Sequence, residues 1–177
     1  MRAPRRARYT KIEKLVEGLL EQHGVTQVPV PVESIVSSYG IHLRKGDLED
    51  VSGLIVRDGS SVTLGVNAKQ SRTRQRFTIA HEFGHFLLHD GMSSHVDHDY
   101  RVNFRSETSS LAVDVEEIEA NFFAASFLMP KQFLDQADAI EALDSDTAVG
   151  QLARSFNVSR HAMSLRLSNV YREHSPF

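Results

Sequence analysis

Apolar residues recur at helical spacing in the first part of the chain. From about Thr10 to His23 they return every three or four residues, which predicts a helix, and Gly24 offers a stop at its C-terminal end. Pro31 is suited to the first position of a second, shorter helix, which is expected to end at Gly40. Two helices therefore precede the first predicted strand.

Short apolar runs follow these helices. Residues 41–44 and 51–57 are predicted to be strands, and residues 62–66 the return strand of a hairpin. Asp58-Gly59 is a strong hairpin-turn signal, because these residues tolerate the positive φ angles of a tight turn. The pattern predicts a small antiparallel sheet. It also suggests that residues 62–66 form an edge that receives an extended substrate by strand addition.

Two long helices are predicted in the middle of the chain, with a polar stretch between them. Ser71 can cap a helix that runs on to Leu87. From about His89 to Ser110 the chain is polar, and a structureless segment of this length is usually functional or mobile. Asp114 opens the second long helix, which becomes apolar almost all round and is therefore expected to be buried.

The C-terminal part is predicted to form two further helices, Asp146 to Phe156 and Ser159 to Tyr171. The complete pattern predicts an α+β fold, in which a small antiparallel sheet packs on a helical bundle. We divide the chain into a main domain, residues 1–143, and a C-terminal helical segment, residues 144–177, packed on the core. Residues 1–9 are expected to form a disordered basic tail.

Composition narrows the classes of function. The chain has 177 residues, which suits one compact domain, and 41% of them are hydrophobic. No apolar run approaches the ~20 residues of a membrane span, and no apolar stretch follows the basic N-terminus as in a secretory signal. Because the chain has no cysteine, any metal must be held by His, Asp or Glu. These features lead us to expect a cytoplasmic protein.

The pentad His81-Glu82-Phe83-Gly84-His85 carries the chemistry. Residues four apart lie on one face of a helix, so the imidazoles of His81 and His85 can reach a single ion. Glu82 points away from that pair and can take a proton from activated water without binding the metal. Gly84 suits a crowded position where another backbone comes close. The alternative is two surface histidines on an amphipathic helix.

A third ligand must come from elsewhere in the chain, because catalytic zinc usually takes three protein ligands and a water. The second long helix is the best source, since it carries acidic residues in its first turns, beside the apolar segment. Acids at this position also favour a helix through its dipole. Periodicity alone does not choose among Glu116, Glu117 and Glu119.

The segments RFTIAHEFGH and ExxANxFAAxxLMP together resemble the ImmA/IrrE-type metallopeptidases, a gluzincin-like family found with phage-type and mobile-element repressors. The resemblance is good over about Gly53 to Pro130 and looser in the flanks. It implies that residues 1–143 form a zincin-like metallopeptidase domain. The family pattern has a metal-binding glutamate three residues before its Ala-Asn pair, and Glu117 occupies that position here. The resemblance therefore implies a metal held by His81, His85 and Glu117. Asn121, one helical turn further on, would orient one of the histidines.

The implied activity is that of a zinc-dependent endopeptidase with Glu82 as its general base. Nitrogen and oxygen ligands also suit Mn²⁺ and Fe²⁺. The implied substrate is a protein, namely a helix-turn-helix repressor or antitoxin encoded nearby.

Two alternatives to this activity stay open. The chain could be a toxin or regulatory component of a toxin–antitoxin or mobile-element module that acts by protein binding. It could also be a non-enzymatic protein whose metal site is structural or sensory. Glu82 favours the enzyme, because a purely structural site needs no adjacent base.

The polar stretch after the pentad holds further histidines, His89, His95 and His98, interleaved with aspartates. One of them, or Tyr100, could stabilise the oxyanion of the transition state. The simpler interpretation is a solvated, mobile loop.

The C-terminal helix pair resembles the helix-turn-helix-like tail of the same family. Arg154, Arg160 and Arg166 could contact phosphate. With a net charge of −3, however, the pair is more consistent with packing on the catalytic core or with helping to bind a protein substrate, so direct nucleic-acid binding is not expected.

Overall fold

The computed structural model describes residues 6–89, 94–98 and 111–171. In this part of the chain two helices come first and three strands follow, and the remaining elements are helical apart from one further strand. In chain order the elements are α1 (Tyr9–Gln22), α2 (Val32–Ser38), β1 (Ile41–Gly46), β2 (Val51–Asp58), β3 (Ser61–Asn67), α3 (Arg72–Leu88), β4 (Ser94–His98), α4 (Leu111–Leu128), α5 (Lys131–Gln136), the 3-10 helix η1 (Ala139–Ala142), α6 (Asp146–Phe156) and α7 (Arg160–Tyr171).

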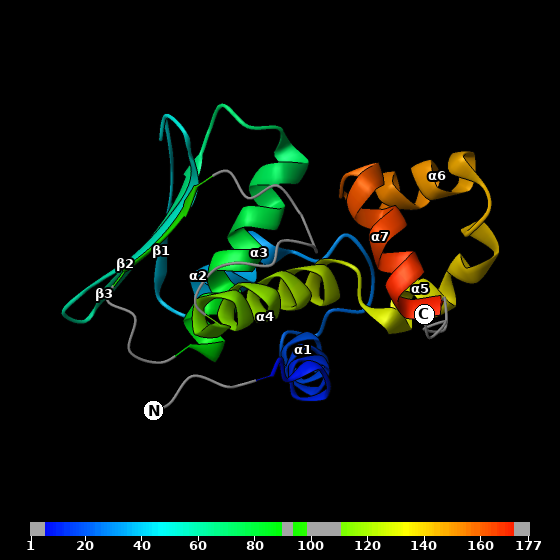
Figure 1. The fold of residues 1–177 in the computed structure, drawn as a ribbon, viewed down its shortest axis with the longest axis horizontal. Helices are drawn as coiled ribbons and strands as arrows, with labels where there is room; N and C mark the ends of the chain where they lie inside the picture. Colours follow the sequence, from blue (N-terminus) through cyan, green and yellow to red (C-terminus); the bar gives the residue numbers. More distant parts are fainter. Residues whose placement is uncertain (1–5, 90–93, 99–110, 172–177) are drawn as a thin grey trace.

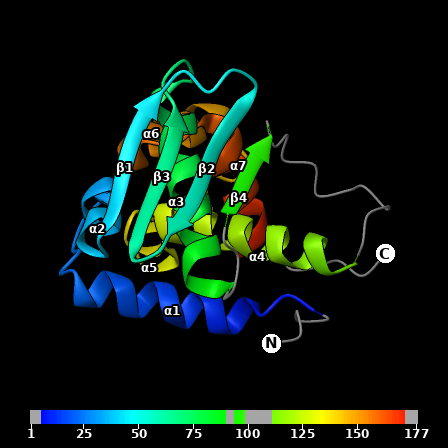
Figure 2. The same cartoon turned by 90° about the vertical axis from the view of Figure 1, so that its left-hand side faces the viewer.

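The four strands form one sheet in the order β1-β3-β2-β4 (Figure 2). β2 and β3 make the predicted hairpin, in which Asp58 pairs with Ser61 and Gly59 has a φ of 58°. The α+β class is confirmed, but the sheet is mixed, because β1 pairs with β3 in parallel. β4 occupies the other side of β2, so β1 lies beyond β3 and runs in the same direction as β3.

Two expectations about strands were wrong. Residues 62–66 lie in β3, which is paired along both sides, so this segment offers no edge for strand addition. The polar stretch after α3 is also not entirely loop, because residues 94–98 form β4 and pair with β2. A polar segment can complete a sheet through its backbone alone, since sheet hydrogen bonds do not depend on side-chain type.

α3 and α4 pack against each other in the middle of the molecule (Figure 1). Ser71 caps α3 as predicted, and its Oγ accepts a hydrogen bond from the backbone N–H of Arg74 at 3.3 Å. Gly84 is the point of closest approach, because a β-carbon there would lie 3.3 Å from the Cα of Ala120 and 3.0 Å from Phe123 Cδ1. The predicted crowding at Gly84 is therefore the contact between these two helices.

The sheet lies on one side of α3 and α4, and the helices α6 and α7 lie on the other (Figure 1). α6 and α7 are joined by a tight turn in which Asn157 has a φ of 53°. Buried arginines attach this pair to the rest of the molecule. Arg76 donates to the carbonyl oxygens of Val30 at 2.8 Å and Asn157 at 3.2 Å, and Arg166 donates to that of Met129 at 3.1 Å.

Burial lowers the pKa of Arg166 to about 10, so its guanidinium stays charged at neutral pH while it is only 4% exposed. Arg166 is therefore not available to a phosphate backbone, contrary to one of the options considered above.

Among the residues that the structure describes, no helix is long and apolar enough to cross a bilayer.

Candidate metal centre

Two histidines of α3 and one glutamate of α4 converge between these helices. The Nε2 atoms of His81 and His85 lie 3.0 Å apart. Glu117 Oε1 is 3.1 Å from His85 Nε2, and Glu117 Oε2 is 3.4 Å from His81 Nε2. Each residue offers one ligand atom, and these atoms all lie within 4.8 Å of one another. This is the combination that the family resemblance implied, brought together from segments far apart in the chain.

Burial differs among the three residues. His81 and His85 are each 1% exposed, whereas the side chain of Glu117 is 21% exposed. Solvent therefore reaches the group from the side of Glu117. A catalytic site needs one such open direction, because water must enter and the substrate must approach.

Glu82 is fully buried beside this group. β2 comes close to it, because a β-carbon at Gly53 would lie 3.5 Å from Glu82 Cγ and would collide with Thr78 Cγ2. Glycine at position 53 therefore lets the sheet backbone approach the helix face that carries Glu82 and Thr78. The sheet thus closes one wall of the site.

Asn121 contacts His81 on the side away from the ligand atoms. Its Nδ2 donates to the backbone carbonyl of Glu117 at 2.8 Å, which leaves Oδ1 to face His81 Nδ1 at 3.2 Å. His81 Nδ1 is therefore the donor in this pair, and its Nε2 presents a lone pair to the ligand group. Of the two histidines that Asn121 might have oriented, the structure selects His81.

His85 makes an analogous contact with His89, which the sequence had suggested only as a possible oxyanion stabiliser in a polar loop. Its Nδ1 lies 3.0 Å from His89 Nδ1, and His89 Nε2 lies 3.2 Å from Glu119 Oε2. His89 is 4% exposed, so it is part of the interior and not of a solvated loop. His81, His85 and His89 recur every four residues, with His89 at the C-terminal cap of α3, and this spacing was the signal that could have identified the contact.

Glu119 is the anchor of this chain of contacts. It is fully buried, and Arg8 binds it through the backbone N–H and Nε, both at 2.8 Å, and through Nη2 at 2.6 Å. Burial alone would raise the pKa of Glu119, but hydrogen bonds from Arg8 and His89 hold that pKa below its ordinary value. Arg8, which we expected in a disordered tail, is instead part of the support of the site.

These contacts determine which nitrogen of His85 faces the ligand group. Ionised Glu119 only accepts hydrogen bonds, so His89 Nε2 is the donor to it. Burial lowers the pKa of His89, which favours a neutral ring whose Nδ1 accepts from His85. His85 therefore carries its proton on Nδ1, and both His81 and His85 present an Nε2 lone pair toward Glu117. Lone pairs this close repel one another, and a cation among them removes the repulsion.

Not every predicted residue can be placed. His95 and His98 lie in β4, where only the backbone is described, and Tyr100 lies outside the described residues. Glu116, the third acid considered as a ligand, does not belong to the His81–His85–Glu117 group.

Comparison with known proteins agrees with this geometry. The sequence profile described as the IrrE N-terminal-like domain, a peptidase family, matches residues 36–168. The chain belongs to this family. The match spans the whole His-His-Glu group and most of the C-terminal helix pair, and it confirms the resemblance stated above.

Two relatives extend the comparison along the chain. The metallopeptidase ImmA of Bacillus subtilis (strain 168) is 25% identical over 160 residues, which cover 90% of this chain and 85% of the relative. An uncharacterized immunity region protein 2 of Bacillus phage phi105 is 26% identical over 145 residues, covering 81% of this chain and 84% of the relative.

A solved structure shares the fold. A Mycobacterium tuberculosis transcriptional regulator superposes with a TM-score of 0.64 at 16% identity, over 93% of this chain and 48% of the regulator. This chain therefore corresponds to about half of that protein. At this identity the likeness extends to the fold alone.

Proposed function

We propose that this chain is a zinc-dependent endopeptidase that cleaves a protein substrate. The observation that carries the proposal is the convergence of His81, His85 and Glu117, with a buried carboxylate, Glu82, next to the first ligand on α3. The name of the Bacillus subtilis relative, a metallopeptidase, supports the same reading. In this proposal His81, His85 and Glu117 hold the metal. Glu82 is the general base, and Asn121 orients His81.

The donor set suits zinc. Two neutral imidazoles and one carboxylate are the protein ligands of many catalytic zinc sites, and the accessible side of Glu117 leaves room for a further ligand. When bound, the metal supplies a Lewis acid that polarises a carbonyl oxygen and lowers the pKa of water toward ~7. Imidazole and carboxylate ligands also accept Mn²⁺ or Fe²⁺, so zinc loading is part of what must be measured.

In this scheme Glu82 transfers one proton in two steps. Glu82 takes a proton from the attacking water and then delivers it to the departing amine nitrogen. Its burial between α3 and β2 keeps bulk water away, so the proton passes to the leaving group and not to solvent. Asn121 and the His89–Glu119–Arg8 chain hold the imidazoles in the tautomer that binds metal.

The substrate we favour is a helix-turn-helix repressor or antitoxin encoded nearby. The phage relative is named an immunity region protein, which supports a setting in phage or mobile-element repression. The competing assignment, a toxin–antitoxin component that acts by binding alone, predicts that the function survives without Glu82. We also propose that residues 1–143 form the catalytic domain and that residues 144–177 support it.

Glu82→Gln tests the proposed function. This variant should bind zinc with unchanged stoichiometry, because Glu82 is not among the ligands, and should cleave the neighbouring repressor about 10²–10⁴-fold more slowly. Zinc content is measured by atomic absorption, and cleavage by mass spectrometry of the products. The matched control is Glu116→Gln, the same change on a helix of the site but outside the ligand group.

Cleavage at the wild-type rate by Glu82→Gln would show that Glu82 is not the general base. Absence of zinc from the wild-type protein after purification with added Zn²⁺ would show that the chain has no zinc site.

A further inference from the structure

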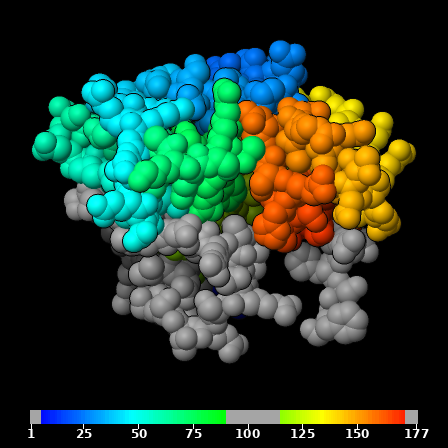
Figure 3. All heavy atoms as spheres, turned by 90° about the horizontal axis from the view of Figure 1, so that it is seen from above, coloured from blue at the N-terminus to red at the C-terminus, as the bar shows by residue number. Residues whose placement is uncertain are grey.

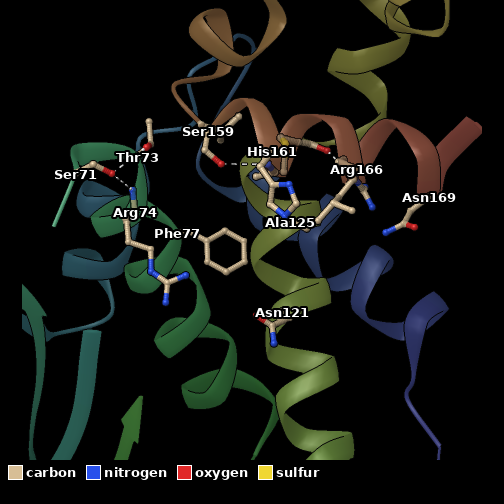
Figure 4. Close-up of a pocket in the computed structure, with 14 residues that line it drawn as sticks. Ser71, Thr73, Arg74, Phe77, Asn121, Ala125, Ser159, His161, Arg166 and Asn169 are labelled. Carbon is tan, nitrogen blue, oxygen red and sulfur yellow. Dashed lines mark hydrogen bonds between the residues drawn. The ribbon is translucent and has the colours of Figure 1, made fainter. Parts of the chain in front are cut away.

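A cavity of about 180 Å³ lies between α3, α4 and α7 (Figure 4). Its wall is apolar where the three helices meet, with Phe77 from α3, Ala125 from α4 and Leu165 from α7. Polar residues surround this wall, among them Arg74 from α3 and His161 from α7. The cavity thus has an apolar interior and a polar rim, which is the usual composition of a site for an organic side chain.

The cavity and the ligand group both lie between α3 and α4. Phe77 lies one helical turn before His81, and Ala125 lies two turns after Glu117, so cavity and ligands use the same faces of α3 and α4. Asn121 lines the cavity and also contacts His81 Nδ1 at 3.2 Å. With a rise of ~1.5 Å per residue, the cavity begins roughly 6 Å from the His81 position along α3.

Helix α7 closes the cavity and is held firmly. Arg166 joins it to the end of α4 through Met129, and Arg76 joins α3 to the turn that precedes α7 through Asn157. Both arginines are buried, so neither bond is exchanged easily with water. The cavity is therefore formed before any substrate arrives. In Figure 3 the strands and α3 (cyan and green) and the helices α6 and α7 (orange) lie side by side on one face.

We propose that this cavity binds the large apolar side chain of the substrate residue next to the cleaved bond. The inference rests on the proposed function and names the specificity of the same site. The occupant follows from reach, because an extended chain advances ~3.3–3.6 Å per residue, and a neighbouring side chain spans the remaining gap. It also follows from size, since an apolar cavity of about 150 Å³ is large enough for benzene.

The assignment gives the C-terminal helix pair a role in substrate selection. α7 contributes Leu165 and Ala162 to the cavity. Its buried arginine, Arg166, donates a hydrogen bond to the backbone carbonyl of Met129. A helix that places apolar side chains in the cavity is suited to contacting a protein substrate. The side chain selected should be leucine, methionine or phenylalanine, and not a charged or small residue.

Paired peptide hydroxamates test the proposal without requiring turnover. The two ligands are identical except for leucine or glycine beside the zinc-binding group, and calorimetry measures their binding to the zinc-loaded Glu82→Gln chain. The leucine ligand should bind about 10–200-fold more tightly, the range expected for filling an apolar pocket. The ratio of the two affinities isolates the cavity, because the zinc-binding group is common to both.

A matched pair of variants locates the effect. Ala162→Leu fills the cavity from α7 and should reduce the leucine-to-glycine ratio to about one, because the space is then occupied. Ser164→Leu adds the same side chain at an exposed position of α7 and should leave the ratio unchanged. Leu165→Ala enlarges the cavity and should lower the ratio, because leucine then fills the space incompletely. A third hydroxamate, with phenylalanine in the same position, should bind this variant more tightly than the leucine ligand does.

The outcomes separate the two proposals. Equal binding of both hydroxamates to the parent chain, or a ratio that Ala162→Leu leaves unchanged, overturns the cavity assignment while the zinc site stands. Failure of both hydroxamates to bind overturns the zinc site and, with it, the cavity assignment. A high ratio that only Ala162→Leu and Leu165→Ala alter is the expected result.

Discussion

The interface between α3 and α4 has two ends that are built on opposite principles. At one end, His81, His85 and Glu117 are ionisable groups in a largely buried position, and supporting residues fix their orientation. At the other end, Phe77 and Ala125 line a cavity with little polar surface. Asn121 is the residue at which the two ends meet.

The difference shows how one pair of helices can separate the chemistry from the selection of the substrate. Buried polar groups are costly unless each is hydrogen-bonded, so the ligand end requires a network that reaches as far as Arg8. The apolar end needs only shape and volume, which packing supplies. Changes at one end should therefore leave the other largely intact, and three predictions test this separation in addition to the two experiments described above.

The largest effect is expected at the ligand end. Glu117→Gln replaces a charged ligand by a neutral amide and should weaken zinc binding by more than about 100-fold, beyond the usual cost of losing an outer-shell partner. Competition with a chromophoric chelator measures the affinity. Glu116→Gln is the control and should change it little. If both variants retain wild-type affinity, Glu117 is not a ligand.

Removal of Arg8 should mainly lower the free energy of unfolding. Arg8→Ala leaves Glu119 buried without its cation, and breaking a buried pair costs about 3 kcal/mol, the low end of the range because Arg8 itself is 28% exposed. Urea unfolding measures the free energy. Lys131→Ala breaks the exposed pair with Asp135, at 2.6 Å, and should cost less than about 1 kcal/mol. Equal losses in the two variants would show that the Arg8 pair gives no special support.

A smaller effect on zinc is expected where the two ends meet. Asn121→Ala removes the acceptor that orients His81 and should weaken zinc binding by about 10–100-fold. Asn169→Ala is the control, because Asn169 lines the cavity from α7 on an exposed part of that helix. Its zinc affinity should be unchanged. A loss of zinc in both variants would show that the two ends are coupled, which contradicts their separation.

Spacing within one helix was sufficient to predict half of the site. His81 and His85 are four residues apart, so a single helical segment brings their side chains to one face. The cap at Ser71 and the hairpin at Asp58-Gly59 are local in the same sense, and both were predicted correctly. Local geometry depends on neighbouring residues, and these can be read in order along the chain.

Packing between distant segments decided the rest. Periodicity could not choose among three glutamates of α4, because the choice depends on how that helix is rotated against α3. The same packing buried Glu119 against Arg8, brought His89 inside and paired β1 with β3 in parallel. Residues of three helices line the cavity, so the sequence of no single segment could predict it. Such contacts join residues far apart in sequence, and their geometry exists only after the chain has folded.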